Sequence, residues 1–400
     1  MAEPLATLTS DAAEVVPSEG LEAKLALGRP LRVKLGLDPT APAVTLGWAV
    51  VLRKLRQFQD LGHTAVLIVG DFTARVGDPS GKSETRPPLS KEEVDAFAER
   101  LLEQFRSVLS TEHLEVRRNS EWLEPMDMEG ILRLTGSTTV ARMLERDDFA
   151  TRYEARQPIS LTEFIYPLLQ GYDSVAVAAD VELGGTDQLF NLLVGRDLQR
   201  DAGQDPQVAL TMPLLEGLDG VQKMSQSLGN YVGVAEPADE QFGKLMSIPD
   251  ALITRYLRLT TDLDPAEVDG IEADLTAGSL PAVEAKRRLA REIVERYHGA
   301  GEGTAAQDRF DRVHRDRELP QDVPEAPIPA DALQEGRVWL PRLLVSLGRA
   351  TSNGEARRLL EQGGVRLDGE VVDDPSREVP PEELRGRVLQ VGRRWFARLV

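Results

Sequence analysis

Residues 65–69 form an unbroken apolar run, AVLIV, that follows an amphipathic helical pattern over residues 48–58. An uninterrupted run of this length is typical of a strand buried on both faces of a parallel sheet. Residues 31–35 alternate in polarity before them and stop at a turn over residues 38–40. Strand, turn, helix and strand in this order predict the doubly wound parallel sheet of an α/β, Rossmann-type domain.

The rest of the chain divides by composition. Ser90 and Glu93 form a capping box that opens a helix over residues 90–108. Residues 240–298 show a helical pattern throughout, and residues 299–336 are rich in glycine and proline, which predicts a linker. Residues 337–400 then resume as a compact unit.

The net charge of −19 is unevenly distributed. Residues 331–400 carry 12 Arg and 11 Asp or Glu, a balance of +1, so residues 1–330 carry −20. Any contact with RNA is therefore expected at the carboxyl-terminal end, although solvated arginines on a small domain would give the same count.

The sequence also disfavours several classes of protein. It contains no cysteine, which excludes disulfides and fits a reducing cytoplasm. Its apolar runs are shorter than the roughly 20 residues of a membrane span, and its acidic N-terminus is unlike a signal peptide. The four histidines are far apart, which argues against a protein-bound metal site. We therefore expect a cytoplasmic protein without a membrane segment.

Three segments carry candidate chemistry. The first reads GLDPTAP over residues 36–42 and continues with Thr45, Leu46, Gly47 and Trp48. A strand that turns sharply into a helix points free backbone N–H groups at a ligand. Thr40 adds a hydroxyl, and Gly47 allows a ligand to approach the helix closely. A glycine at such a position can equally serve packing alone.

In the second segment, residues 160–173, Tyr166, Gln170 and Asp173 share one face of a helix that is otherwise apolar. Three polar groups on a half-buried helix need partners, unless that face is turned to water. Downstream, residues 184–188 (GGTDQ) form a glycine turn that brings Asp187 and Gln188 to the start of a helix.

The third segment, residues 217–230, is a loop rich in glycine and serine with a single lysine, Lys223. A flexible loop that carries a cation suits a lid that closes on phosphates. Its composition is equally that of an ordinary surface loop.

Taken together and in order, these segments resemble the bacterial tyrosyl-tRNA synthetases over about residues 30–400. The strings that carry the resemblance are GLDPTAP, GDFTARVGDPSG, ISLTEFIYPLLQGYD, VELGGTDQ and KMSQSLGN. The resemblance implies a Rossmann-type catalytic domain over residues 1–232, with an insertion and dimer region at about 119–158, and a helical anticodon-side domain over 233–298. After the linker at 299–336, it implies a small α+β RNA-binding domain over 337–400, like that of a ribosomal protein.

The resemblance also implies the reaction and its residues. Tyrosine and ATP would give tyrosyl-adenylate, with Mg²⁺ accompanying the ATP, and the tyrosyl group would pass to tRNA(Tyr). A homodimer is expected. Tyrosine would be bound by Lys34, Asp78, Tyr166, Gln170 and Asp173, ATP or adenylate by Gly36, Asp38, Gly47, Gly185, Asp187 and Gln188, and RNA by Arg349, Arg357, Arg358 and Arg366. The catalytic groups would be Thr40, Thr45, Lys223 and Gln226.

The sequence departs from the family where the family binds triphosphate. The His-x-Gly-His signature reads Thr45-Leu46-Gly47-Trp48, and Gln226 replaces the second lysine of Lys-Met-Ser-Lys-Ser. Trp48 continues the apolar stripe of its helix, so we interpret it as a packing residue. Two alternatives therefore stand beside an active ligase: a catalytically weakened paralogue that binds tyrosine or its adenylate, and a non-enzymatic RNA-binding protein.

Overall fold

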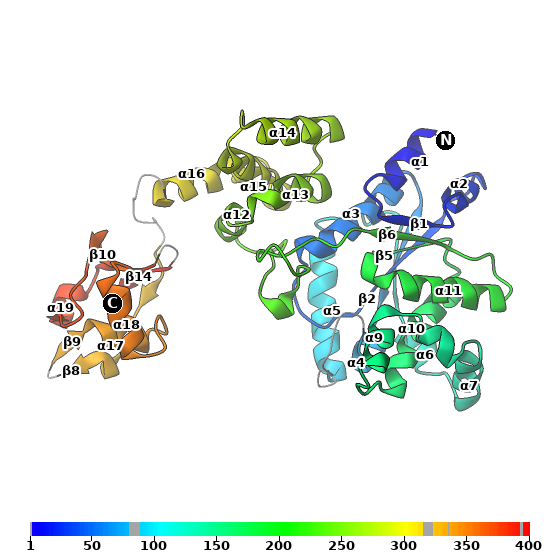
Figure 1. Ribbon diagram of the computed structural model, residues 1–400, viewed down its shortest axis with the longest axis horizontal. Coiled ribbons are helices and arrows are strands. Elements are labelled where there is room, and N and C mark those ends of the chain that lie inside the picture. The colour runs from blue at the N-terminus through cyan, green and yellow to red at the C-terminus, as the bar shows by residue number, and fades with distance from the viewer. Residues whose placement is uncertain (1, 80–88, 315–322, 335, 393–394) are drawn as a thin grey trace. The chain divides into compact units, whose positions relative to one another are not determined.

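The computed structural model describes residues 2–79, 89–314, 323–334, 336–392 and 395–400 (Figure 1). The chain packs as two units, Met1–Gly299 and Ala300–Val400. Each unit has its own hydrophobic core.

The first unit is built on a six-stranded sheet with the order β1-β6-β5-β2-β3-β4. Five strands are parallel: β2 (Arg32–Leu37), β3 (Thr64–Val69), β4 (Leu114–Arg118), β5 (Val181–Gly185) and β6 (Val208–Met212). The edge strand β1 (Glu14–Val16), between α1 (Ala2–Thr9) and α2 (Gly20–Leu25) in the sequence, runs antiparallel to β6. The strand order reverses between β2 and β5, and ligands of such sheets bind beyond the carboxyl ends of the strands at that point. The predicted α/β class is confirmed.

Helices cover both faces of this sheet. Figure 1 shows α3 (Leu46–Asp60) and α5 (Lys91–Phe105) on one side, and α10 (Leu161–Ala176) and α11 (Leu189–Asp201) on the other. Both predicted capping boxes are present, at Ser90 and at Ser160. A Cβ on Gly171 of α10 would lie 3.1 Å from the backbone nitrogen of Gly195 on α11. These two helices therefore pack backbone against backbone, which only glycine permits.

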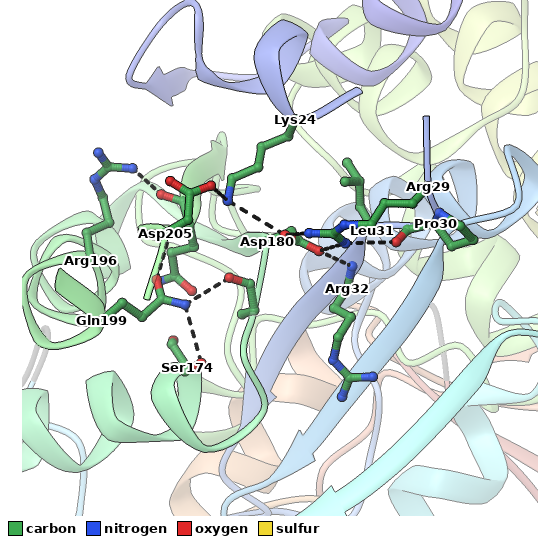
Figure 2. A network of polar contacts seen from close by, with 12 residues as sticks. Lys24, Arg29, Pro30, Leu31, Arg32, Ser174, Asp180, Arg196, Gln199 and Asp205 are labelled. Carbon is green, nitrogen blue, oxygen red and sulfur yellow. Dashed lines mark hydrogen bonds and ion pairs between the residues drawn. The ribbon is translucent and has the colours of Figure 1, made fainter. Parts of the chain in front are cut away.

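Salt bridges join the amino ends of β2 and β5 (Figure 2). The Arg29 guanidinium donates to both carboxylate oxygens of Asp180, at 2.8 and 2.7 Å, and the Arg32 backbone N–H donates to the same carboxylate at 2.9 Å. Lys24 lies 3.6 Å from Asp180 and 2.5 Å from Asp205. Burial alone would raise the pKa of Asp180, but these partners hold it below its ordinary value. This end of the sheet is closed by ion pairs, and the carboxyl ends stay open.

An insertion of short helices lies between β4 and α10. It contains α6 (Ser120–Leu123), α7 (Met128–Gly136), α8 (Val140–Met143) and α9 (Asp147–Glu154), and the short α4 (Thr73–Val76) precedes α5. Leu134 and Met143 pack into a core with α10, whereas Met128, Leu132 and Val140 are more than 60% exposed. Some apolar residues of the insertion thus face the core beside α10, and others are exposed on the surface.

After β6 the first unit continues in helices. These are α12 (Ala238–Met246), α13 (Ile253–Thr260), α14 (Pro265–Ala277) and α15 (Ala282–His298), as the periodicity of residues 240–298 predicts. They attach to α3, where the Arg53 guanidinium donates to the carbonyl of Leu259 at 2.7 Å and to Asp262 at 2.6 Å. Among the helices described in both units, none is long and apolar enough to cross a bilayer.

The second unit is a small α+β domain. Its main sheet has the order β11-β10-β13-β14-β7, and a smaller sheet has the order β12-β9-β8. The helices α17 (Leu340–Ser346) and α18 (Asn353–Glu361) pack on these sheets around a core that includes Val338, Leu343 and Leu360. The bounds of the remaining elements are β8 (Leu333–Gln334), β9 (Arg337–Trp339), β10 (Val365–Leu367), β11 (Glu370–Val371), β12 (Glu378–Val379), α19 (Pro381–Leu384), β13 (Val388–Val391) and β14 (Trp395–Leu399).

The prediction of a linker over residues 299–336 needs correction. This range contains the helix α16 (Glu302–His314), and β7 (Glu325–Ala326) pairs in parallel with β14. Proline is tolerated on the edge strand of a sheet, so a proline-rich composition did not exclude β7. Residues 315–322 of the predicted linker lie outside the described residues.

Candidate functional site

A cavity of about 1790 Å³ opens at the carboxyl ends of β2 and β5, where the strand order reverses. The strands contribute residues 35–38 and 183–185, and α10 contributes Tyr166, Gln170 and Asp173. The amino end of α3 and loop residues 223–227 line further parts of the cavity. Segments that are far apart in the sequence, and were singled out for their chemistry, thus meet in one place.

Asp173 lies buried at one end of this cavity. Trp122 Nε1 donates to one carboxylate oxygen at 2.8 Å, and Asn119 Nδ2 lies 3.4 Å from the other. Burial raises the pKa of Asp173 to about 7, although Lys34 and these two donors lower it. Asp173 is therefore an acceptor held in a fixed orientation and close to neutralisation at pH 7.

A second carboxyl group, that of the half-buried Asp38, contacts residues of α10 and α4. The Tyr166 hydroxyl donates to it at 2.8 Å and the Thr73 hydroxyl at 2.6 Å. Burial raises its pKa to about 7, and the nearby charges of Asp78 and Asp173 act in the same direction. Burial and the neighbouring carboxylates also raise the pKa of Tyr166, which stays a hydrogen-bond donor. This side of the cavity favours a cation.

Side-chain amides connect the remaining predicted groups. Gln188 Nε2 donates to Asp78 at 3.0 Å, and Asn191 Nδ2 donates to Gln170 at 2.9 Å and to Gln188 at 3.1 Å. Arg146 is buried, pairs with Asp148, and lies 4.0 Å from Asp78. The structure thus joins Asp78, Gln170 and Gln188, which the resemblance assigned to tyrosine and to the nucleotide, in one hydrogen-bonded group.

Sequence reasoning missed five residues of this site: Thr73, Asn119, Trp122, Arg146 and Asn191. Asn119 and Thr73 follow the carboxyl ends of β4 and β3, so the rule that located the other residues could also have indicated them. Trp122 and Arg146 come from the insertion, whose approach to α10 depends on tertiary packing.

Lys34 does not take the place that the resemblance implied. Its ammonium is fully buried and contacts Glu182 at 2.8 Å, the Ser174 hydroxyl at 2.8 Å and the backbone carbonyl of Gln170 at 2.8 Å. Because all three partners belong to α10 and β5, Lys34 holds together two of the elements that line the cavity. Its influence on Asp173 is electrostatic.

The altered signature at the start of α3 has a clear local structure. The Thr45 hydroxyl accepts the backbone N–H of Trp48 at 3.3 Å and so acts as the N-cap of α3. Gly47 contacts Met224, and the backbone nitrogen of Gly47 lies 3.4 Å from the Met224 sulfur. Trp48 is 36% exposed and lines the cavity, so the interpretation that it is a packing residue is wrong. The core face of α3 is formed by neighbours such as Ala49 and Leu52 instead.

The lysine-bearing loop lies against the cavity. Lys223 Nζ is 2.7 Å from a carboxylate oxygen of Asp187. Both residues line the cavity, as do Thr40, Gly36 and Gly185. Both polar atoms of the Gln226 amide contact the backbone of Ala43. The loop that composition predicts to be flexible is therefore held by contacts of the Lys223 and Gln226 side chains.

The predicted RNA-binding arginines belong to the second unit. The Arg349 guanidinium lies 5.1 Å from the ring centroid of Trp395, and that of Arg357 lies 5.2 Å from that of Trp339. Arg366 donates to the carbonyl of Gly369 at 3.0 Å, and Arg358 is exposed. Surfaces that bind single-stranded nucleic acid combine positive charge with aromatic side chains on which bases can stack.

Comparison with known proteins agrees with the fold. The family described as tRNA synthetases class I (W and Y) matches residues 26–315, and the S4 domain matches residues 338–384. A Rossmann-type sheet with a polar cavity at its switch point, followed by an S4 domain, therefore defines a class I tRNA synthetase. Within that class, two bacterial tyrosine–tRNA ligases are 55% and 51% identical over 403 residues, so the chain belongs to the bacterial tyrosyl-tRNA synthetases.

The relatives that support this assignment match over the whole chain. The tyrosine–tRNA ligase of Moorella thermoacetica is 55% identical and covers 100% of this chain and 96% of its own. That of Geobacter sulfurreducens is 51% identical and covers 100% and 99%. The tyrosyl-tRNA synthetase of Archaeoglobus fulgidus, solved in complex with L-tyrosine, is 22% identical, has a TM-score of 0.63, and covers 76% of this chain and 99% of its own. At that identity the solved structure supports the fold alone.

Proposed function

We propose that this chain ligates tyrosine to tRNA(Tyr) in two steps. A carboxylate oxygen of tyrosine attacks the α-phosphorus of ATP, the bond to the bridging oxygen breaks, and pyrophosphate leaves. A ribose hydroxyl at the 3′ end of tRNA then attacks the activated carbonyl, and AMP leaves. The observation that carries the proposal is the buried Asp173, oriented by Trp122 and Asn119 at the end of a cavity that also holds a lysine-bearing loop. We also infer that the reaction takes place in the cytoplasm.

The tyrosine end would use the groups on α10 together with Asp78. The phenolic hydroxyl would donate to Asp173, and the substrate ammonium would lie near Tyr166, Gln170 and Asp78. Several carboxyl groups lie at this end of the cavity, and none of the described lysines and arginines there lacks an acidic partner. This balance of charge supports binding of a cationic substrate group at this end.

The nucleotide end would use the strand ends and the loop. Asp38, Asp187 and Gln188 would bind the ribose and adenylate, beside the backbone of Gly36, Gly47 and Gly185. Thr40 and Lys223 would contact the phosphates, for which Lys223 would exchange its present partner Asp187. No three acidic or histidine side chains in the described ranges are placed to hold a metal ion. Mg²⁺ commonly binds through substrate phosphates and water, which fits its arrival with ATP and neutralisation of the triphosphate.

The direct test is tyrosine-dependent ATP–pyrophosphate exchange by the purified protein, followed by charging of tRNA(Tyr). We expect both activities. The altered residues Thr45, Trp48 and Gln226 favour one other candidate, a synthetase paralogue with weak activation. That candidate predicts tyrosine binding in calorimetry with exchange reduced by several orders of magnitude. Absence of tyrosine binding would reject both.

Tyrosine affinity should depend on pH around neutrality. Since burial raises the pKa of Asp38 and Asp173 to about 7, both carboxyl groups take up protons as the pH falls through 7. Protonation removes negative charge that attracts the substrate ammonium, so the dissociation constant should rise as the pH falls. One coupled proton gives about a tenfold rise between pH 8 and pH 6. Calorimetric titrations at both pH values measure it, Asp173→Asn should reduce the dependence, and a flat profile would contradict the assignment.

We further propose a homodimer that forms through the insertion. Its exposed apolar side chains include Met128 at 69%, Leu132 at 64% and Val140 at 64%. An apolar cluster of this kind often marks a protein–protein contact. Light scattering at micromolar concentration should show a dimer, and Leu132→Glu should give a monomer. Val283→Glu, which alters an exposed valine on α15, is the matched control, and a monomeric unmodified protein would reject the proposal.

The second unit is proposed to bind tRNA through its arginines. Replacing Arg357 and Arg358 together by glutamine should weaken tRNA binding and flatten its salt dependence by about one to two units of logarithmic slope. The double variant Arg377→Gln and Arg385→Gln removes the same charge from exposed positions elsewhere in the unit and should bind normally. Amino-acid activation, which needs no RNA, should be equal in both variants. Equal tRNA affinity in both would contradict this surface.

A further inference from the structure

The segment Pro42–Val44, which links β2 to α3, is bound by two glutamine side chains. Gln104 of α5 accepts the backbone N–H of Val44 at 2.8 Å and donates to the carbonyl of Pro42 at 2.8 Å. Gln226 of the lysine-bearing loop accepts the backbone N–H of Ala43 at 3.2 Å and donates to the carbonyl of Ala43 at 2.5 Å. Each amide makes one donor and one acceptor contact to this segment, as a neighbouring strand would.

The Gln226 contact extends a short backbone ladder. Beyond the loop, Thr45 forms an antiparallel bridge with Gly233, the Leu46 N–H donates to Val232 at 2.9 Å, and the Val234 N–H donates to Val44 at 2.8 Å. Within the loop, the Asn230 side chain accepts the backbone N–H of Ser225 at 2.8 Å and donates to the carbonyl of Lys223 at 3.2 Å. Lys223 itself forms an antiparallel bridge with Glu216, so the contacts of Gln226 and Asn230 hold the part of the loop that follows it.

We propose that Gln226 is a positioning residue, which latches the Lys223 loop onto segment 42–44 and so sets where the Lys223 ammonium lies over the cavity. The amide suits this contact because it both donates and accepts, whereas a lysine in its place could only donate. Both polar atoms of Gln226 face protein backbone, so its effect on the phosphates passes through Lys223. This inference rests on the proposed function for its effect on catalysis, but the latch itself is a property of the free protein.

Limited trypsin digestion tests the latch without reference to activity. Lys223 is partly exposed, with 41% of its side-chain surface accessible, and cleavage after it requires the loop to leave the cavity. Mass spectrometry can follow the peptide bond between Lys223 and Met224 in the native protein. Gln226→Ala and Gln226→Met, which keeps the length without hydrogen bonds, should speed this cleavage about tenfold, as the loss of two hydrogen bonds allows. Val221→Ala, an exposed change in the same loop, should leave the rate unchanged. Equal rates in all four proteins would overturn the latch.

Kinetics of pyrophosphate exchange test the consequence for the reaction. Gln226→Ala should lower kcat about tenfold and leave the KM for tyrosine within about twofold, because the tyrosine groups lie on α10. Gln226→Lys should also lower kcat. An increase of kcat in Gln226→Lys would show that a cation acts directly at this position and would overturn the positioning role. If the unmodified protein lacks exchange, the proposed function fails, and the digestion experiment still decides the latch.

Discussion

Replacement of Asp173 by alanine is expected to remove most of the preference for tyrosine over phenylalanine. With Asp173 present, phenylalanine leaves a buried carboxylate without the phenolic donor, whereas the alanine variant has no such group to leave unpaired. A hydrogen bond to a charged group contributes about 1.5–3 kcal/mol, so the ratio of the two kcat/KM values should fall on the order of tenfold to a hundredfold or more. Pyrophosphate exchange with each amino acid measures this ratio.

Asp173→Asn is the matched control for this prediction. Asparagine keeps the volume and one carbonyl acceptor, and it loses the charge that Trp122 and Asn119 now orient. Its selectivity should fall between that of the unmodified protein and that of the alanine variant. Unchanged selectivity in Asp173→Ala, in a folded protein, would show that the phenolic hydroxyl binds elsewhere.

Lys34→Met should give the largest loss of stability. The ammonium and Glu182 are both buried, at 0% and 1% side-chain exposure, and the substitution leaves the carboxylate without its counter-ion. Breaking a buried ion pair from one side costs about 3–5 kcal/mol. The free energy of unfolding, from urea titration of the unmodified protein and the variant, measures the loss.

The double variant Lys34→Met with Glu182→Gln separates charge from shape. It removes both charges, and the new side-chain amide could keep the contacts with Ser174 and Gln207 that Glu182 now makes. Much of the stability should return, since the penalty comes from one uncompensated charge. A single variant as stable as the unmodified protein would mean that water or another group compensates Glu182.

Several features were predictable because they depend on local rules. The apolar run of residues 65–69 became β3, and the spacing of Tyr166, Gln170 and Asp173 did place all three in one cavity. The partner of Lys34 was also accessible in principle. Lys34 and Glu182 are paired residues of adjacent parallel strands, so two charges in two otherwise buried strands could have suggested each other.

Other features depended on tertiary structure. The orientation of Trp122 toward Asp173 comes from how the insertion packs against α10, which no local pattern encodes. Trp48 fits the spacing of an apolar stripe, but the first turn of α3 projects it toward the cavity. The edge strand β7 was missed because it has only two residues and is flanked by prolines.

The backbone contact between Gly171 and Gly195 has a consequence for altering substrate range. α10 carries Tyr166, Gln170 and Asp173, and at this crossing the backbone of Gly171 lies close to the backbone of Gly195 and to the Leu198 side chain of α11. A methyl group at Gly171 would press on the backbone of Gly195 and displace α10, so the three substrate groups would move together, and a methyl group at Gly195 would meet the Gln207 side chain. Variant libraries that aim to accept bulkier amino acids should therefore keep both glycines constant. They should vary side chains of the insertion, such as Trp122, because these can change without moving α10.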